Sequence, residues 1–185
     1  MSENQNGNTK RAPAVVVGVD GSAGARDALV WALAEARLRR WPVRAVHAWM
    51  FGYIGGSVEG YPYWGGGLGS YTSLGIDLGD LHHAAEDLLE RALADVKDEA
   101  DDVEIDRQVV QGSAAEVLVR EATAGDLLVV GSRGHGGFAG LVLGSVSQQC
   151  VHHAPCPVVV IHPAKPNATR DESETGAETR EPAIA

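Results

Sequence analysis

The amino-acid sequence predicts an α/β fold with one parallel β-sheet and helices on both of its faces. The first observation is an alternation: five short apolar runs of strand type take turns with four segments whose apolar residues recur at helical spacing. Parallel strands need such crossover helices, because each strand must begin at the same end of the sheet. The second observation is length, since 185 residues with 44% hydrophobic content can bury one ordinary core. No stretch of the chain repeats, so a single doubly wound domain is expected.

The first elements follow from clear start and stop signals. A continuous apolar run over residues 14–20 is typical of a buried parallel strand. Ser22 can cap the helix that follows, in which apolar residues between 24 and 39 lie on one face. Pro42 ends that helix, and residues 43–49 are expected to form the second strand.

The second half of the sheet is equally patterned. Residues 80–99 carry the cleanest helical stripe in the sequence, and residues 103–110 alternate apolar and polar side chains, as an edge strand does. Ser113 and Glu116 have the spacing of a capping box, which predicts the start of a third helix. The remaining elements are expected at residues 127–131 (strand), 145–153 (helix) and 157–162 (strand).

Three segments fall outside this pattern. Residues 1–12 and 163–185 are polar and lack periodicity, so a disordered arm and an acidic disordered tail are expected to flank a domain at 13–162. Residues 51–79 form a long glycine-rich stretch with scattered tyrosine and tryptophan. Loops of this length are uncommon in compact domains. The stretch is either a lid or partner-binding loop, or a mobile insertion whose aromatic residues pack loosely on the sheet edge.

Composition excludes several functional classes. A formal net charge of −10 argues against a nucleic-acid-binding surface, which needs a basic face. Two cysteines cannot build a disulfide framework and fit a reducing compartment. The first thirteen residues lack the apolar core of a signal peptide, and no apolar run has the length of a membrane span. The expected protein is cytoplasmic and binds neither nucleic acid nor membrane.

The stretch that follows the fourth strand is the candidate ligand site. The apolar run 127–130 leads into a glycine-rich loop, and Gly144 and Ser145 close that loop and open a helix. Glycine lets the backbone approach a ligand closely, and a helix start offers unpaired N–H donors with a partial positive charge. Ser145 and Ser147 add hydroxyl groups as caps or phosphate donors. The loop glycines are Gly131, Gly134, Gly136, Gly137 and Gly140.

Two common phosphate-binding loops do not fit this stretch. A P-loop ends on a lysine followed by serine or threonine, and no lysine lies between Asp126 and Pro163. A dinucleotide loop has three spaced glycines after the first strand and an acidic residue at the end of the second. This chain offers Gly18 and Gly21 after its first strand and ends the second on residues 47–49, none of which is acidic.

The spacing that does stand out is Gly131, two residues, Gly134, nine residues, and then Gly144 with Ser145. It resembles the nucleotide loop of the universal stress protein family, in its UspA-like, ATP-binding branch. The resemblance extends over about residues 13–162. Three matching blocks in the right order make it more specific than the loop spacing alone. The other two blocks are residues 15–22 and 153–160.

The resemblance implies a Rossmann-like sheet with strand order 3-2-1-4-5, in which the first and fourth strands are neighbours. A ligand then lies beyond the carboxyl ends of the strands, where the order reverses. There Asp20 would contact ribose or a phosphate-bound Mg²⁺, Ala48 would offer its backbone to adenine, and Arg133 and His135 would supply positive charge. The residues expected to bind ATP are Gly18, Asp20, Ala48, Gly131, Ser132, Arg133, Gly134, His135, Gly136, Gly137, Gly144, Ser145, Val146 and Ser147.

For function, the resemblance implies a stress-response regulatory module that binds ATP and forms a homodimer through the fifth strand, residues 157–162. No nucleophile with a neighbouring base is visible in the sequence near the loop, so no catalytic residue is assigned. Two alternatives stay open. One is a cyclic-AMP-binding protein of the same fold, and the other is a slow ATPase or nucleotidyl-transfer enzyme.

Overall fold

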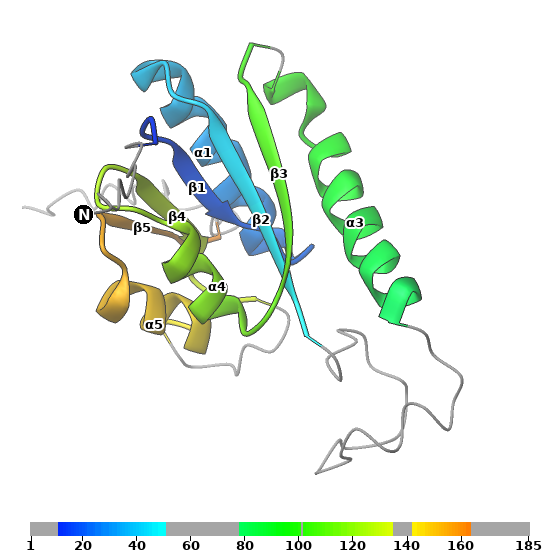
Figure 1. The fold of residues 1–185 in the computed structure, drawn as a ribbon. Helices are drawn as coiled ribbons and strands as arrows, with labels where there is room; N and C mark the ends of the chain where they lie inside the picture. Colours follow the sequence, from blue (N-terminus) through cyan, green and yellow to red (C-terminus); the bar gives the residue numbers. More distant parts are fainter. Residues whose placement is uncertain (1–10, 51–77, 101, 135–141, 164–185) are drawn as a thin grey trace, which may run out of the picture.

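A computed structural model shows one five-stranded parallel sheet with the strand order β3-β2-β1-β4-β5 (Figure 1). It describes residues 11–50, 78–100, 102–134 and 142–163. The predicted fold class and strand order are therefore confirmed. The strands are β1 (Val15–Gly18), β2 (Val43–Trp49), β3 (Ile105–Gln111), β4 (Leu127–Gly131) and β5 (Val158–Ile161).

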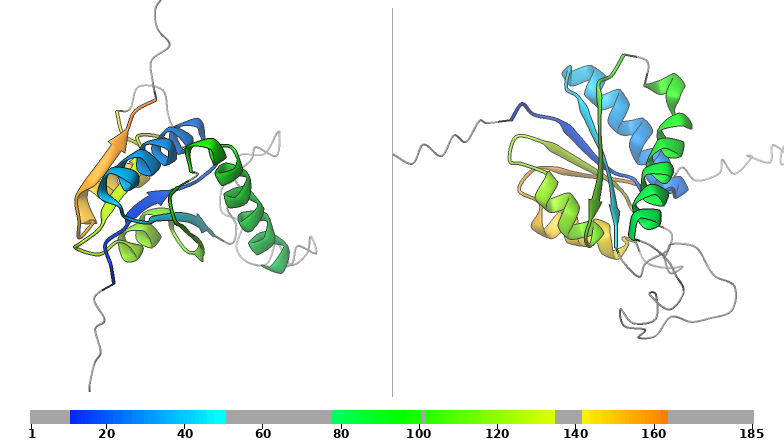
Figure 2. Two further views of the ribbon diagram at one scale, coloured as in Figure 1. Left: turned by 90° about the horizontal axis from the view of Figure 1, so that it is seen from above. Right: turned by 45° about the vertical axis from the view of Figure 1, so that its right-hand side comes forward.

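The helices form a layer on each face of the sheet, as the two views of Figure 2 show. The helices are α1 (Ala23–Arg39), α3 (Leu78–Ala94), the short 3₁₀ helix η1 (Lys97–Glu99), α4 (Ala114–Glu121) and α5 (Ser145–His153). Helices α1 and α3 cover one face, while α4 and α5 cover the other. Within the described ranges, no helix combines the length and the apolar character that crossing a bilayer requires.

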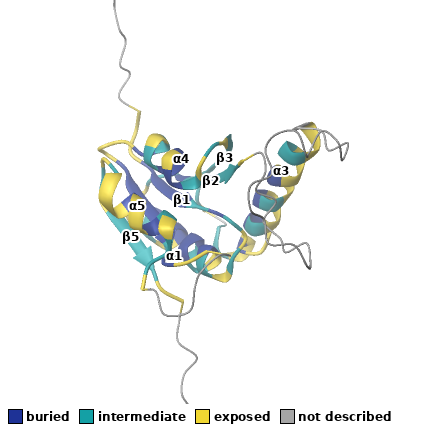
Figure 3. Ribbon diagram, turned by 90° about the horizontal axis from the view of Figure 1, so that it is seen from below, coloured by how far each residue is buried: buried dark blue, intermediate teal, exposed yellow. Residues whose placement is uncertain are grey.

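Burial follows the alternation of side chains along the strands. In β1, Val15 and Val17 pack with α1 and α3, whereas Val16 packs with α4, and all three side chains are fully buried. Figure 3 shows the buried residues along β1 and the inner side of α1. The central strand is thus apolar on both faces, which explains its uninterrupted apolar sequence.

Helix α1 begins and ends as its sequence predicts. The Ser22 side chain accepts a hydrogen bond from the Ala25 N–H at 3.2 Å, which confirms the predicted cap. At the other end Arg40 adopts a left-handed conformation with φ 57°, and its N–H donates to the carbonyls of Ala36 and Arg37. This turn redirects the chain toward Pro42 and β2.

Two other helices differ in detail from the prediction. Instead of one helix at residues 80–99, the chain forms α3 followed by η1. The α-helical hydrogen-bond pattern changes to the tighter 3₁₀ pattern at Val96, whose N–H donates to the Leu93 carbonyl. The Val96 side chain is fully buried. Ser113 is the N-cap residue of α4, as expected, but its hydroxyl makes no capping hydrogen bond. The predicted capping-box bond is therefore absent, and the Val117 N–H to Ser113 carbonyl bond begins the helix.

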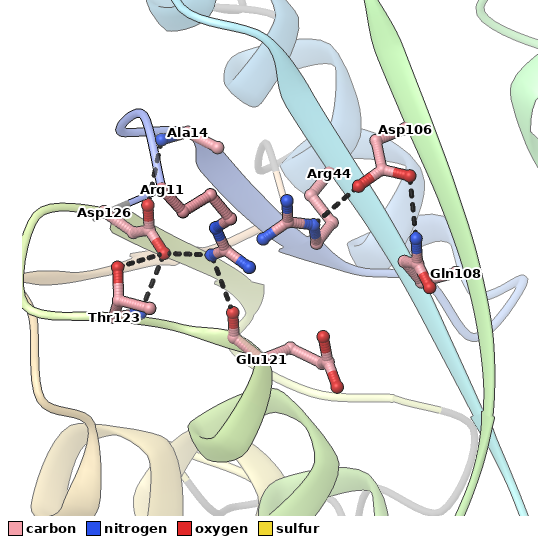
Figure 4. A network of polar contacts seen from close by, with 8 residues as sticks. All are labelled: Arg11, Ala14, Arg44, Asp106, Gln108, Glu121, Thr123 and Asp126. Carbon is pink, nitrogen blue, oxygen red and sulfur yellow. Dashed lines mark hydrogen bonds and ion pairs between the residues drawn. The ribbon is translucent and has the colours of Figure 1, made fainter. Parts of the chain in front are cut away.

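A network of hydrogen bonds joins the segment before β1 to the segment before β4. The Arg11 guanidinium donates to the Asp126 carboxylate at 2.6 Å and to the Glu121 carbonyl at 3.0 Å (Figure 4). The Asp126 side chain is fully buried and also accepts from the N–H groups of Ala14 (2.9 Å) and Thr123 (2.8 Å). Arg11, expected within a disordered arm, is thus bonded to the domain at the amino end of β4.

This contact changes what trimming the chain should do. A chain of residues 11–163 should unfold at the same temperature as the full chain. A chain of residues 12–163, which lacks Arg11, should lose about 1 kcal/mol or less, because the guanidinium is 36% exposed and partly screened by water. That corresponds to a melting temperature lower by about 2–4 °C. Thermal unfolding of the three chains side by side tests this, and equal midpoints would show that Arg11 contributes nothing.

Candidate functional site

Two segments meet at the carboxyl ends of the central strands β1 and β4. Strands β1 and β4 pair in register from Val15 with Leu127 to Val17 with Val129, so both strands end at the same level of the sheet. The turn into α1 and the loop that leaves β4 therefore lie next to each other. This is the point where the strand order reverses, at which α/β sheets bind ligands.

Asp20 and the glycine loop are in direct contact. A Cβ atom built at Gly134 would overlap with Asp20 Oδ2, so the loop backbone passes very close to the carboxylate. The other carboxylate oxygen accepts a hydrogen bond from the Ser22 N–H at 2.9 Å, which fixes the side chain. The structure thus brings together two residues that the sequence predicts in one site.

A second glycine contact joins β4 to α1. A Cβ at Gly131 would lie 2.8 Å from the carbonyl carbon of Gly24 and 3.2 Å from the Ala25 nitrogen. A Cβ at Gly24 would in turn lie 2.8 Å from the Arg133 carbonyl oxygen. Sequence reasoning missed Gly24, although a glycine three residues after Gly21, inside the first turn of a helix, is a visible signal.

Gly131→Ala should therefore destabilise the fold. The atoms that a methyl group would meet belong to the backbone of α1 and cannot swing away, so we expect a loss of about 1–3 kcal/mol in the free energy of unfolding. Gly144→Ala is the matched control, because a Cβ there has only ordinary contacts at 3.5 Å and the backbone is extended (φ −78°, ψ 167°). Urea unfolding of both variants tests the contrast, and equal midpoints would contradict it.

The loop closes on itself at the start of α5. The Gly144 N–H donates to the Ser132 carbonyl at 2.7 Å. The Ser147 hydroxyl lies 3.0 Å from the same carbonyl and 3.0 Å from that of Gly144, and Ser147 is only 2% exposed. The Ser147 hydroxyl is thus directed at backbone carbonyls, and its role as a phosphate donor, one of the two roles expected of it, stays a prediction. The Gly144 N–H is likewise turned toward the protein.

The donors that remain at the start of α5 belong to the first helical turn. N–H groups in a first turn have no intrahelical acceptor, and here they include those of Ser145 and Val146. The Ser145 side chain is exposed, and the first turn of α5 contains no acidic residue. The helix start therefore attracts anions.

Gly18 and Ala48 have packing roles of their own. A Cβ at Gly18 would lie 3.0 Å from Leu118 Cδ1, so the missing side chain makes room for α4. Ala48, near the end of β2, packs in the same α4-side core. Both positions lie at the carboxyl ends of strands, as expected. Ser132, also at this edge, is fully buried, and its Oγ has no hydrogen-bond partner among the residues that the structure describes.

His47 supports the site and was not predicted. Its Nδ1 lies 2.7 Å from the Val19 carbonyl oxygen, and the Val19 N–H donates to the Val46 carbonyl at 2.9 Å. These bonds tie the end of β1 to β2, immediately before Asp20. A histidine at the end of a strand beside the switch point is the only signal that the sequence carries.

Some predicted residues fall outside the described ranges. These are His135, Gly136 and Gly137 of the glycine loop, together with residues 51–77 of the long loop. Arg133 is described and exposed, and it forms no ion pair with any described residue. No group of three or more His, Cys, Asp or Glu side chains in the described part of the chain could hold a metal ion.

Comparison with known proteins identifies relatives of the whole domain. The model of the universal stress protein family matches residues 68–162. Universal stress protein Rv2623 of Mycobacterium tuberculosis is 36% identical over 146 residues, which cover 79% of this chain and 44% of that protein. The chain therefore spans about half the length of the curated relatives that it matches.

Solved structures share the fold. A universal stress protein in complex with cAMP aligns over 82% of this chain and 98% of its own, with a TM-score of 0.55 and 22% identity. The universal stress protein from Archaeoglobus fulgidus in complex with dAMP aligns over 82% and 98%, with a TM-score of 0.51 and 23% identity. Together with the family match, the parallel sheet and the glycine loop at its switch point lead to one conclusion: this chain belongs to the universal stress protein family.

Proposed function

We propose that the chain binds an adenine nucleotide, most favourably ATP, between the turn after β1 and the start of α5. The observation that carries the proposal is the contact between Asp20 and the loop backbone at Gly134, beside a helix start without acidic residues. A carboxylate at this point can accept hydrogen bonds from ribose hydroxyls or bind a nucleotide-held Mg²⁺. The helix start can bind phosphate. The two structural neighbours with bound cAMP and dAMP support adenine as the base.

The distribution of donors favours a triphosphate. Ser145 offers an exposed hydroxyl and, with Val146, first-turn N–H groups, while Arg133 is an exposed cation that forms no ion pair with a described residue. A single cyclic phosphate would leave part of this set unused. Hydrogen bonds from the Arg133 guanidinium to phosphate oxygen atoms would be charge-assisted, which makes Arg133 the strongest single donor.

As a binding module, the protein would act by changing its interactions when nucleotide is bound, as part of a stress response in the cytoplasm. Both cysteines are unpaired, in keeping with a reducing compartment. Turnover would be slow at most. An enzyme needs a base positioned for catalysis, and among the described residues His47, which lies beside the turn at Asp20, is engaged with the Val19 carbonyl.

Calorimetric titration of the full chain with ATP and with cyclic AMP, each with and without Mg²⁺, tests the proposal. We expect one ATP per chain, bound more tightly than cyclic AMP, and a gain in ATP affinity with Mg²⁺ that Asp20→Asn removes. Tighter binding of cyclic AMP would support the alternative ligand, and steady phosphate release would support an ATPase. The proposal would be overturned if the protein bound neither ATP nor cyclic AMP.

We also infer a homodimer that pairs along β5. This strand lies at the edge of the sheet next to β4, and all four of its residues are apolar and only partly buried. An open apolar edge strand invites uncontrolled pairing, and soluble proteins avoid it. A second copy of the same strand would cover the edge.

The register shows which backbone groups face that edge. The Leu128 N–H donates to the Pro157 carbonyl and the Ser132 N–H donates to the Ile161 carbonyl, at 3.0 and 2.7 Å. The N–H and C=O of one strand residue point to the same side, so alternate residues of β5 are bonded to β4. The N–H of Val160 therefore points outward.

Val160→Pro should convert the dimer to a monomer, because proline removes an outward donor. Val159→Pro is the matched control: its N–H points toward β4, so it should lower the melting temperature of the domain itself. Light scattering and thermal unfolding of both variants separate the two effects. A native protein that is a monomer in light scattering would disprove the inferred dimer.

A further inference from the structure

We propose that a cavity between α1 and α3 binds a small organic anion with an apolar body, separately from the nucleotide. The cavity has a volume of about 340 Å³, which lies within the range of about 300–1,000 Å³ typical of small-molecule sites. It opens beside the turn that follows β1, on the face of the sheet that α1 and α3 cover. The proposal does not depend on nucleotide binding.

The floor of the cavity is apolar. Val19 and Leu29 line it and are 4% and 0% exposed. Leu88 and Ala92 of α3 line the other wall and are partly buried against the same core. A ligand in contact with the partly exposed Leu88 and Ala92 would remove their apolar surface from water, which favours an apolar or aromatic body.

The rim carries two cations from different helices. Arg26 of α1 and Arg91 of α3 both line the cavity, both are exposed, and neither forms an ion pair with a described residue. Guanidinium groups bind carboxylate, sulfonate and phosphate groups through paired hydrogen bonds. Asp95 also lines the rim, four residues after Arg91, but no ion pair joins the two. Its carboxylate can accept a hydrogen bond from a hydroxyl or amine of the ligand.

Asp20 is the boundary between this cavity and the glycine loop. The carboxylate is held by the Ser22 N–H and contacts Gly134, while no residue of the loop 131–134 or of α5 is among the described residues that line the cavity. The cavity and the proposed nucleotide site therefore share the turn at Asp20, while the described residues of the glycine loop and of α5 belong to the nucleotide site alone. A ligand of either site need not displace a ligand of the other.

The probe for this site is 1-anilinonaphthalene-8-sulfonate, which combines aromatic rings with one sulfonate and fluoresces in apolar surroundings. We expect the full chain, without nucleotide, to bind one probe molecule while folded. Arg26→Gln combined with Arg91→Gln should weaken binding at least tenfold, and Ala92→Trp should abolish it by filling the cavity. Arg120→Gln, an exposed substitution on α4 across the sheet, should leave the affinity unchanged.

Thermal unfolding of each variant shows whether it is folded at the temperature of the titration. Equal probe affinity of the native protein and the folded double-arginine variant would overturn the proposal. Competitive displacement of the probe by ATP would also overturn it, because the cavity would then belong to the nucleotide site. A protein that binds the probe but no nucleotide would refute only the proposed function.

Discussion

Asp126→Ala should lower the free energy of unfolding by about 3–5 kcal/mol, the range expected when one partner of a buried charged network is removed. The carboxylate is fully buried and accepts four hydrogen bonds from three residues, Arg11, Ala14 and Thr123. Without it, the buried N–H of Ala14 and the partly buried N–H of Thr123, just before β1 and β4, would have no acceptor. Because these groups set where both central strands begin, the loss should extend to the whole domain.

Two control variants show whether this loss comes from buried donors or from charge alone. Arg11→Ala removes the exposed partner and should cost about 1 kcal/mol or less. Asp102→Ala removes a carboxylate that pairs with Arg37, and both side chains are exposed (61% and 39%), so it should also cost little. Urea unfolding of the three variants is the measurement. An Asp126→Ala protein no less stable than Arg11→Ala would contradict the role of the buried carboxylate.

The same network predicts how stability depends on pH. Burial alone would raise the pKa of Asp126, but the hydrogen bonds from Thr123 and Ala14 and the charge of Arg11 outweigh it, so its pKa lies below the usual value. A carboxyl group whose pKa is lower in the folded state stabilises the fold above its unfolded pKa and loses that contribution as the pH falls through the folded pKa. The difference in the free energy of unfolding between the native protein and Asp126→Ala should therefore be largest at neutral pH and become smaller as the pH falls into the acid range.

The fold could be predicted from the sequence because its signals are local. Apolar runs and helical stripes alternate along the chain, and each needs only neighbouring residues to be recognised. The contact between Arg11 and Asp126 spans 115 positions, so no local pattern predicts it, and Arg11 was placed in a disordered arm. The contacts of Gly24 and His47 are similarly set by the packing of separate segments.

In the candidate site, too, some features could be predicted from the sequence and others could not. The spacing of Gly131, Gly134 and Gly144 predicts which backbone segments come together, because glycine positions report close approach. The direction of each polar group could not be predicted. Ser147 is expected to act as a cap or as a phosphate donor, and no local pattern predicts that its hydroxyl lies 3.0 Å from the carbonyl oxygens of Ser132 and Gly144.

The central claim is that nucleotide phosphate lies at the start of α5, and Gly144→Glu tests it most directly. The backbone at Gly144 is extended and a Cβ there has ordinary contacts, so the fold should tolerate the substitution. A carboxylate is favourable at a helix start. The Cβ of the new side chain would lie next to the backbone of Arg133. From there the new carboxylate would repel bound phosphates, and two like charges 4 Å apart at a protein surface repel each other by about 4 kcal/mol. That is enough to abolish measurable ATP binding.

Gly144→Gln is the matched control, because it has the same shape without the charge. ATP affinity by calorimetry and thermal unfolding should be measured on the same samples of the native protein and both variants. The account predicts that Gly144→Glu keeps the native melting temperature within a few degrees and shows no ATP binding, while Gly144→Gln retains part of the affinity. A folded Gly144→Glu protein that binds ATP as tightly as the native chain would show that the phosphates lie elsewhere.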